Sequence, residues 1–444
     1  MLKALILSGA LLSITLSSAV SEKPGHDKWM KKAIGVLSAS VMKEADWALL
    51  QNPETVTASR AVRSAGGVHD FFSEGDYWWP DPRHVDSPYI QRDGMTNPDN
   101  FVDHRRAMIR FSRVMGALAS AYLINMDERH AEHAFRHARA WFMDIETLMS
   151  PHLRFAQAIK GRFTGRGIGI IDTIHLLEVA KALEIFEKSR TAKRSEYVVF
   201  RNWFADYLKW MTTHPYGIDE SRALNNHGTC WTLQVAGFAS FTGNDSLLQV
   251  CRERFQDIHL PGQMAADGSF PKEIARTKPY GYSLFNLDAM VMICQVLGNT
   301  ARHEALGTSD KRRVTSDKGG GKRGNTARHE AQGTSDKRRV TSDKGGGMRG
   351  DLWSVTIDGG RSIRKGIDFM LPYVRDKKQW PFKQDVMYWD EWPVAHPFLL
   401  FSAIAYQDES IFQTWAELNH EPETEEVIRN LPIRHPLMWL KETR

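Results

Sequence analysis

Apolar residues in this chain recur at intervals of three and four positions, the spacing of one face of an α-helix. Alternating apolar and polar runs, which are typical of half-buried strands, are scarce. The pattern predicts helices over Ala107–Leu123, Glu132–Leu148, Ile174–Phe186, Val198–Met211, Thr229–Ala239, Leu284–Leu297, Ile363–Val374 and Pro397–Ala405. Many amphipathic helices in one chain favour an all-α fold of stacked helical hairpins, as in an (α/α) toroid.

The first residues follow a different pattern. Lys3 precedes an apolar run from Ala4 to Leu16, and small residues follow up to Ala19. A basic start, a short apolar run and a small-residue cleavage site are typical of a secretory signal peptide. We therefore expect residues 1–19 to be removed and the protein to be secreted and extracellular; the alternative is a buried first helix. No later segment has 18 uninterrupted apolar residues, so no membrane contact is expected after cleavage.

A tandem repeat with a period of 26 residues occupies Gly298–Arg349, and its two copies differ at two positions. Glycine triplets, charges and scarce apolar residues cannot bury a core, so we predict a disordered insertion. It would divide one catalytic domain into residues 20–297 and residues 350–444, which include a C-terminal tail. A basic arm that binds polyanions is a functional alternative, and a recent duplication or an artefact of the gene sequence is a simpler one.

Composition and charge exclude several classes of protein. The 444 residues are 42% hydrophobic and 25% charged, which excludes a disordered or fibrous protein. The net charge of +5 originates in the insertion, whose 13 Lys and Arg face only 6 Asp and Glu. Because the rest of the chain carries no excess of positive charge, the net charge does not indicate that the folded protein binds nucleic acid. Three cysteines are too few for a disulfide scaffold, and the lack of a C-x-x-C pair argues against a zinc site, so we expect no metal and no cofactor.

Two clusters place aromatic and polar residues where the helical periodicity breaks. In DYWWPDP, Trp78 and Trp79 are expected on a loop, where their rings could stack on a sugar; the alternative is that one or both fill the core. The second cluster contains Gln157 and then GRGIGIIDT, which includes Arg166. Its glycines lack the G-K-[ST] ending of a phosphate loop, so they predict a tight turn into the next helix.

Two further clusters carry groups suited to acid chemistry. Asn225-Asn226-His227-Gly228 opens a predicted helix, where backbone and side-chain donors favour negative charge, although either asparagine alone could be only an N-cap. The other cluster runs from Asp267 to Asp288 and contains Arg276, Lys278, Tyr280 and Tyr282. A lone tyrosine is more often a core residue, whereas an arginine with two tyrosines beside proline and glycine is a stronger signal.

Amides, an imidazole, a guanidinium and phenols together suit the removal of a proton next to a carboxylate. Hydrogen bonds and positive charge on that carboxylate make the neighbouring carbon acidic, because the developing charge spreads onto oxygen. A base removes the proton and an acid protonates the departing oxygen. In a polysaccharide of uronic acids, this reaction is β-elimination across the glycosidic bond.

The same motifs resemble the alginate lyase family of secreted polysaccharide lyases. The resemblance covers about Trp29–Ala405 without the repeat, and it rests on YWWPDP, QAI followed by GRGIGIIDT, NNHG, ARTKPYGYSLFNLDA and KQDVMYWDEWPVAHPFLLFSA, in that order. It implies an incomplete (α/α) toroid with a groove at one end, an acidic polysaccharide such as alginate or glucuronan as the partner, and no metal. A monomer is expected.

The resemblance also implies roles for individual residues. Asn226 and His227 would neutralise the substrate carboxylate, and His227 would also be a base for one epimer. Arg276 would help to hold that carboxylate, and Tyr282 would be the acid and also the base. The chain has Pro279-Tyr280-Gly281 where relatives often have a Ser-x-His run, so the choice between Tyr282 and Tyr280 stays open. The remaining candidates for substrate binding are Trp78, Trp79, Gln157, Arg166, Tyr280 and Lys278.

Two other functions are compatible with the same sequence. An inverting glycoside hydrolase on an (α/α) toroid would recruit two carboxyl groups from among Asp172, Asp267, Glu273 and Asp390-Glu391. A non-catalytic glycan-binding protein would retain the aromatic residues without the chemistry. His130, His133 and His137 share one face of a predicted helix, which we interpret as a solvated face rather than a metal site.

Overall fold

The computed structural model describes residues 26–84, 86–307 and 351–440. The predicted signal peptide and residues 308–349 of the insertion lie outside these ranges, so both remain predictions. The insertion begins within a described element, because the last helix before it continues to Gly307.

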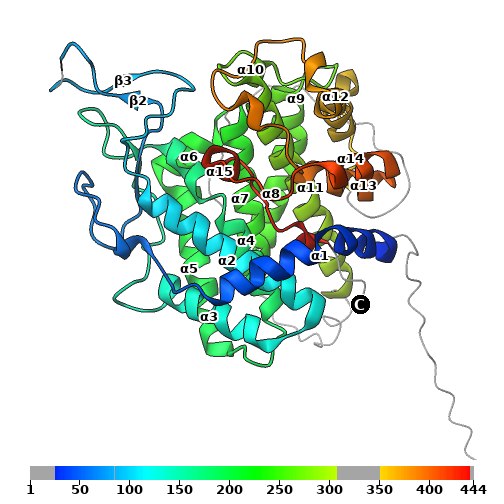
Figure 1. The fold of residues 1–444 in the computed structure, drawn as a ribbon, viewed down its shortest axis with the longest axis horizontal. Helices are drawn as coiled ribbons and strands as arrows, with labels where there is room; N and C mark the ends of the chain where they lie inside the picture. The colour runs from blue at the N-terminus through cyan, green and yellow to red at the C-terminus, as the bar shows by residue number, and fades with distance from the viewer. Residues whose placement is uncertain (1–25, 85, 308–350, 441–444) are drawn as a thin grey trace, which may run out of the picture.

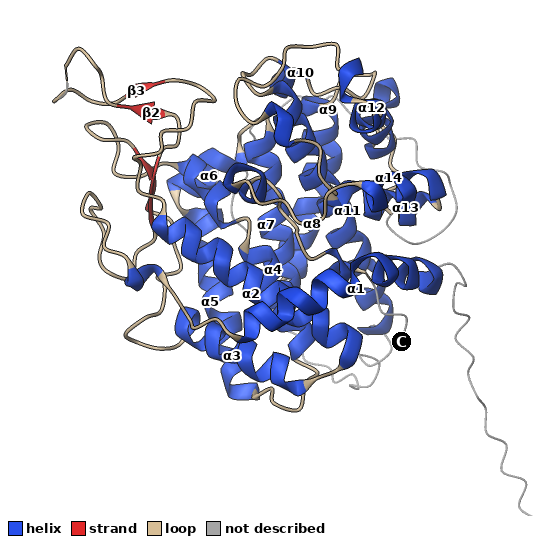
Figure 2. Ribbon diagram, viewed as in Figure 1, coloured by secondary structure: helices blue, strands red, loops and turns tan. Residues whose placement is uncertain are grey.

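Helices dominate the described chain and pack as hairpins in two layers (Figures 1 and 2). In one layer, each helix packs against the next; its members are α2 (Asp103–Asn125), α4 (Leu176–Phe186), α7 (Asn226–Thr242), α11 (Pro279–Gly307) and α13 (Pro397–Tyr406). Each helix of the second layer packs on one of these; its members are α3 (Glu128–Phe142), α5 (Arg194–Thr213), α8 (Asp245–Arg254), α12 (Ile363–Arg375) and α14 (Glu409–Glu417). This arrangement is the predicted all-α toroid.

The remaining elements complete the ring and its loops. Helix α1 (His26–Leu49) packs along α2, and the Trp29 indole nitrogen donates to Gln407 at 3.0 Å, next to α14. The short helices are α6 (Pro215–Ser221), α9 (Leu260–Gln263), α10 (Pro271–Ile274) and α15 (Glu425–Arg429). Single turns of 3₁₀ helix cover Val56–Ala58, Asp358–Gly360, Lys377–Gln379, Trp389–Glu391 and Pro436–Trp439; a longer one covers Gly167–Thr173, and Phe255–His259 form a π-helical turn.

Two small sheets lie at one end of the helical layers. Strand β1 (Phe72–Glu74) pairs in parallel with β4 (Phe155–Ala158), and Phe72 lies opposite Phe155. Strand β2 (Trp78–Trp79) pairs antiparallel with β3 (Ile90–Gln91) in a ribbon that projects from the helices (Figure 2). These strands and their loops position most of the polar side chains described below.

The core lies between the two helical layers. Helices α7 and α11 carry apolar residues on every side because neighbouring helices enclose them. Asp103–Asn125 and Pro279–Gly298 are long and apolar enough to cross a membrane by length and composition, but 72% and 89% of the tested windows are buried inside the protein. Both therefore have the burial expected of core helices.

The eight predicted helices are all present. The structure differs from the prediction in the ends of one helix, in two elements that were not predicted, and in the burial of one helix face. The helix predicted over Glu132–Leu148 begins four residues earlier, after the N-cap Asp127, and ends at Phe142. The sequence interpretation missed α1, and it placed Trp78 and Trp79 on a loop where β2 forms. The interpretation of His130, His133 and His137 as a solvated face was wrong, because α1 and its following turn cover them.

Candidate active site

An open cleft of about 650 Å³ lies at the end of the toroid that carries the small sheets. Segments far apart in the sequence supply its walls. The lining residues are Asp76, Tyr77, Trp78, Gln91, Asp93, Gln157, Arg166, Ile168, Ile171, Asn226, His227, Arg276, Tyr282, Phe285, Arg429 and Asn430. All four predicted catalytic residues are among them.

The N-terminus of α7 presents Asn226 to the cleft. Asn225 occupies the N-cap position, but its side chain makes no capping hydrogen bond. Instead, the backbone N–H of Asn226 donates to Oε1 of Glu273 at 2.7 Å. The amide oxygen of Asn226 has no hydrogen-bond partner although the residue is buried. The side-chain oxygen of Asn226 is therefore available to a ligand in the cleft.

His227 is held by a buried carboxylate. Its Nδ1 lies 2.6 Å from Oε1 of Glu220, which belongs to α6. Burial acts to lower the pKa of His227, but the Glu220 carboxylate outweighs burial and the pKa lies above its usual value. The imidazole is thus poised to carry a positive charge beside the cleft.

Tyr282 stands on the first turn of α11 and points its hydroxyl toward a second phenol. The hydroxyl oxygens of Tyr282 and Tyr77 form a hydrogen bond. Burial raises the pKa of both side chains. Each phenol is therefore neutral at neutral pH and carries a proton. The Arg276 guanidinium lies 4.8 Å from the centre of the Tyr282 ring.

Arg276 is itself fixed by an acidic partner. Its Nε and Nη2 donate to the two oxygens of Asp93 at 3.3 and 2.8 Å, and the Thr277 hydroxyl donates to the same carboxylate at 2.9 Å. Burial opposes the charge of Arg276, but Asp93 raises its pKa overall. Two-pronged pairing holds the guanidinium in one orientation.

Trp78, Gln157 and Arg166 form another part of the wall. Arg166 lies 5.8 Å from the centre of the Trp78 ring, and Arg162 lies 5.3 Å from it. Gln157 has a left-handed backbone, with φ 53°, which is uncommon for a residue that carries a side chain. Its carbonyl oxygen accepts a hydrogen bond from Nε of Arg166 at 2.8 Å. The glycines around Arg166 allow close packing: a Cβ at Gly169 would lie 2.5 Å from Cβ of Ala156.

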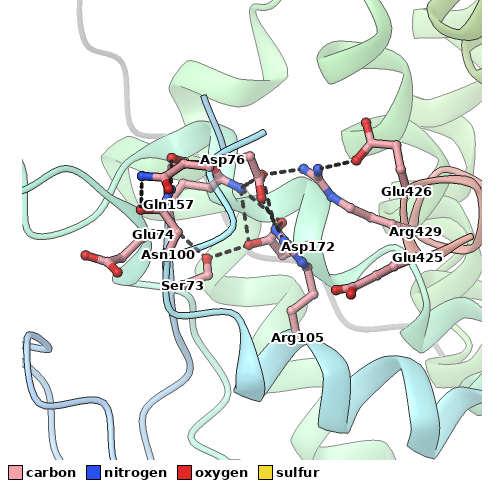
Figure 3. Close-up of polar contacts among 12 residues, drawn as sticks. Ser73, Glu74, Asp76, Asn100, Arg105, Gln157, Asp172, Glu425, Glu426 and Arg429 are labelled. Carbon is pink, nitrogen blue, oxygen red and sulfur yellow. Dashed lines mark hydrogen bonds and ion pairs between the residues drawn. The ribbon is translucent and has the colours of Figure 1, made fainter. Parts of the chain in front are cut away.

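A buried network of charges supports this wall (Figure 3). Arg105 of α2 pairs with Asp76 at 2.7 Å and reaches Asp172 at 3.4 Å. Arg429 of α15 pairs with Asp76 at 2.6 Å. Gln157 donates to both carboxylates. The network ties the C-terminal segment to the β1–β2 loop, so one face of the cleft depends on residues from both ends of the chain.

Three predicted binding residues lie outside the cleft lining. The Tyr280 ring is fully buried against Trp380 and Trp389, and its hydroxyl donates to the Tyr373 carbonyl at 3.0 Å. Lys278 is buried in an ion pair with Glu426 at 2.7 Å.

Trp79 is the third. It donates its indole N–H to the Met95 carbonyl at 2.9 Å, on the side of β2 opposite to Trp78. The structure therefore separates Trp78 from Trp79, and Tyr282 from Tyr280.

The sequence interpretation did not assign the acidic residues that position the cleft. Asp93 lies 183 residues before Arg276, and Glu273 lies 47 residues after Asn226. No spacing rule joins such distant residues. Glu220 is nearer, seven residues before His227, but nothing in a single sequence marks it as a partner. Within residues 26–84, 86–307 and 351–440, no three His, Cys, Asp or Glu side chains gather as a metal site would need.

The family model described as alginate lyase matches residues 55–314, more than half of the chain. The chain belongs to the alginate lyase family. It is similar to the crystal structure of an alginate lyase from Bacteroides ovatus, with a TM-score of 0.71, 28% identity, and coverage of 94% of this chain and 98% of that one.

A more distant similarity concerns the fold alone. A variant of alginate lyase A1-III complexed with a tetrasaccharide aligns with a TM-score of 0.50 and 11% identity, over 91% of this chain and 95% of that one. No curated protein sequence matches the chain. As a member of the alginate lyase family, the protein is a polysaccharide lyase with an (α/α) toroid fold.

Proposed function

We propose that this alginate lyase family member cleaves a polymer of uronic acids, alginate or a related polyuronate such as glucuronan, in the cleft described above. The observation that carries the proposal is the convergence of Asn226, His227, Arg276 and Tyr282 on one cleft. They come from the start of α7, from the loop before α11 and from α11 itself.

Three of these residues neutralise the negative charge of the substrate carboxylate. The Asn226 amide, the His227 imidazolium and the Arg276 guanidinium surround the position of the substrate carboxylate. Together they stabilise the negative charge that develops on its oxygens when the neighbouring carbon loses a proton. Because Glu220 raises the pKa of His227, the imidazole suits this role better than proton removal, which requires a free lone pair.

Tyr282 carries the proton transfer. Because the Tyr282 phenol is protonated, the two proton transfers occur in one step: as the hydroxyl proton moves to the glycosidic oxygen, the phenol oxygen takes the proton from C5 of the uronate, and the electrons of that C–H bond form the C4–C5 double bond. The C4–O bond to the next sugar breaks, and the leaving oxygen receives a proton from the Tyr282 hydroxyl. The tyrosine ends with one proton, as it began, so no further acid or base is consumed. Tyr280 is not placed for this chemistry, because its hydroxyl bonds a core carbonyl.

The proposal also covers the domain organisation of the chain and the location of the protein. We take residues 20–297 and 350–444 as one catalytic domain interrupted by the insertion, and residues 1–19 as a signal peptide that directs secretion. An extracellular polysaccharide lyase meets its substrate outside the cell, and a monomer is sufficient because the described cleft is built from one chain.

A matched pair of tyrosine variants tests the proposal. Wild-type protein is mixed with alginate, glucuronan or pectate, and the unsaturated product is followed by its ultraviolet absorbance. Tyr282→Phe is expected to lose about 10²-fold or more in kcat while still binding the polymer. Tyr280→Phe is expected to keep its activity. Cleavage without an unsaturated product would indicate hydrolysis, and binding without cleavage would indicate a glycan-binding protein.

A further inference from the structure

The first turn of α11, which carries Tyr282, has no capping side chain of its own. Pro279 opens the helix and has no N–H, so the backbone N–H groups of Tyr280 and Gly281 are the donors that need an acceptor. The residue before the helix is Lys278, whose side chain contains no acceptor atom. Because this end of α11 is buried, an acceptor must come from elsewhere in the chain.

Asp385 supplies that acceptor from a distant part of the sequence. Its Oδ1 accepts the N–H of Tyr280 at 2.8 Å, and its Oδ2 accepts the N–H of Gly281 at 2.9 Å. These are the second and third residues of the helix, whose N–H groups an N-cap side chain ordinarily binds. The Asp385 side chain is buried. One carboxylate therefore caps α11 with both of its oxygens.

Gly281 is required for this close approach. A Cβ at Gly281 would lie 2.9 Å from Oδ2 of Asp385 and 3.1 Å from Nε1 of Trp392. Any larger residue would push the carboxylate away from the helix. The glycine and the carboxylate thus form one contact to which both segments contribute.

The segment that contains Asp385 also binds the backbone next to Arg276. Val386 donates its backbone N–H to the carbonyl of Thr277 at 3.0 Å, and Thr277 follows Arg276 directly. Asp385 and Val386 therefore hold the chain between Arg276 and Tyr282 on both sides of the start of α11.

We propose that Asp385 is a positioning residue for the reaction: it holds the first turn of α11, and with it the Tyr282 hydroxyl, in the orientation that proton transfer needs. The inference rests on the proposed function, because it assigns a partner to the proposed acid and base. Asp385 is not among the residues that line the described cleft, so it acts through α11 and not on the substrate. A displacement of about 1 Å at a reacting group can lower the rate by about 10²-fold.

The carboxyl group gives this contact a dependence on pH. Burial raises the pKa of Asp385 to about 6, although its two N–H donors and the ammonium groups of Lys278 and Lys377 act to lower it. Lys377 is shared with Asp390–Glu391, and the phenol of Tyr280 stays neutral because burial raises its pKa. Protonation of Asp385 turns one acceptor oxygen into a hydroxyl, so the cap weakens as pH falls through about 6.

Asp385→Asn tests the inference, and Asp408→Asn is its matched control. Asp408 caps α14 in the same way, because it accepts the N–H groups of Ser410 and Ile411 at 3.0 and 3.3 Å, but α14 belongs to the second helical layer and carries none of the proposed catalytic residues. Each variant replaces one acceptor oxygen by an amide NH₂. On a polyuronate, Asp385→Asn should lower kcat about ten- to a hundredfold with KM little changed, whereas Asp408→Asn should keep the wild-type kcat.

The pH profile of kcat separates positioning from a general loss of stability. In wild type, kcat should fall as pH drops through about 6, and Asp408→Asn should show the same fall. Asp385→Asn should lack it, because an amide does not titrate in this range. Equal kcat values for Asp385→Asn and Asp408→Asn, or an unchanged acid limb in Asp385→Asn, would overturn the positioning role and leave the lyase activity intact. Absence of unsaturated product from wild type would instead overturn the proposed function.

A second variant keeps the test decisive if Asp385→Asn does not fold. Gly281→Ala retains the carboxylate, and alanine is a better helix former than glycine. Its Cβ would nevertheless displace Oδ2 of Asp385, so kcat should fall. Gly35→Ala in α1 is the control, because no described atom lies within 4 Å of the added Cβ, and it should keep the wild-type kcat. A folded Gly281→Ala protein with the kcat of Gly35→Ala would contradict the inference.

Discussion

The hydroxyl oxygens of Tyr77 and Tyr282 lie 2.7 Å apart, although 205 positions separate the two residues in the sequence. One belongs to the loop before β2 and the other to the first turn of α11. Burial raises the pKa of both phenols, so at neutral pH both stay protonated and one hydroxyl donates a hydrogen bond to the other. The hydroxyl oxygen of Tyr282, the proposed acid and base, is therefore held in a defined position before substrate binds.

Replacing Tyr77 by phenylalanine removes this partner and keeps the ring. Loss of one neutral hydrogen bond is worth about 1 kcal/mol, so kcat should fall by about five- to tenfold, well short of the loss expected for Tyr282→Phe. Steady-state kinetics on a polyuronate measure the difference. An unchanged kcat would show that Tyr282 needs no partner.

Glu220→Gln should change how activity depends on pH. Glu220 raises the pKa of His227, so wild type keeps the imidazolium to higher pH than a free histidine would. Glutamine keeps a hydrogen-bond acceptor and removes the charge. The alkaline limb of the kcat/KM profile should therefore shift to lower pH. Profiles that superimpose would place the charge of His227 outside the rate-determining chemistry.

Arg276→Ala should reduce kcat by about 10²- to 10³-fold, the usual effect of losing one fixed donor to a developing oxyanion. Part of that loss has a second cause, since Asp93 would be left unpaired and would repel an acidic substrate. The double variant Arg276→Ala/Asp93→Asn should accordingly bind the polymer better than Arg276→Ala alone. A substrate with esterified carboxylates should depend less on Arg276, and equal dependence on both substrates would contradict the assigned role.

Asn226→Ala offers an independent test of charge neutralisation. The side-chain oxygen of Asn226 has no hydrogen-bond partner, and Glu273 accepts a hydrogen bond from the backbone N–H of Asn226. Removing the amide should leave the melting temperature close to that of wild type while kcat falls by about 10²-fold. A large loss of stability with little change in kcat would assign Asn226 to structure alone.

His435 should make the stability of the fold depend on alkaline pH. Its Nδ1 lies 3.1 Å from Glu178 and its Nε2 3.2 Å from Glu44; burial opposes the charge, but the two carboxylates raise the pKa to about 9. The stabilisation is complete below the unfolded pKa of about 6.5 and is lost as pH rises through 9.

Denaturant unfolding at pH 6 and pH 9.5 measures the effect. Wild type should lose up to about 3 kcal/mol of unfolding free energy between the two conditions. His435→Gln should be less stable at pH 6 and nearly independent of pH over the same interval. The exposed His84 provides a control, because His84→Gln should behave as wild type does.

Deleting Gly298–Arg349 should leave folding and lyase activity close to those of the parent. The described residues on either side of residues 308–350 include a close pair, since a Cβ at Gly298 would be 3.5 Å from Oδ1 of Asp351. Closing a long loop costs only about 0.6 kcal/mol for each doubling of its length, so the insertion imposes little strain. Melting curves and activity at high salt test this, and an unfolded deletion variant would make the repeat structural.

The helices were predictable because their apolar residues follow the helical period. Even α1, which was not predicted, shows the signal: Trp29, Ala33, Leu37, Val41 and Ala45 recur every fourth residue and are buried. The four proposed catalytic residues lie in motifs that are contiguous in the sequence, so their place in one cleft was predictable. The partners Asp93, Glu220 and Glu273 were not, because ion pairs across a toroid leave no local pattern. Tyr280 and Tyr282 likewise point in different directions from the first turn of α11. Which of the two faces the cleft depends on how α11 packs in the fold, and the sequence alone does not show this.

The last described segment of the chain supplies both Arg429, which lines the cleft, and His435, which is buried against α2 and α4. A ribosome releases these residues only after every helix of the toroid has emerged. Until then, Asp76 lacks one of its two arginine partners and Glu178 lacks its histidine. The nascent polypeptide therefore has no complete cleft at any earlier stage of translation.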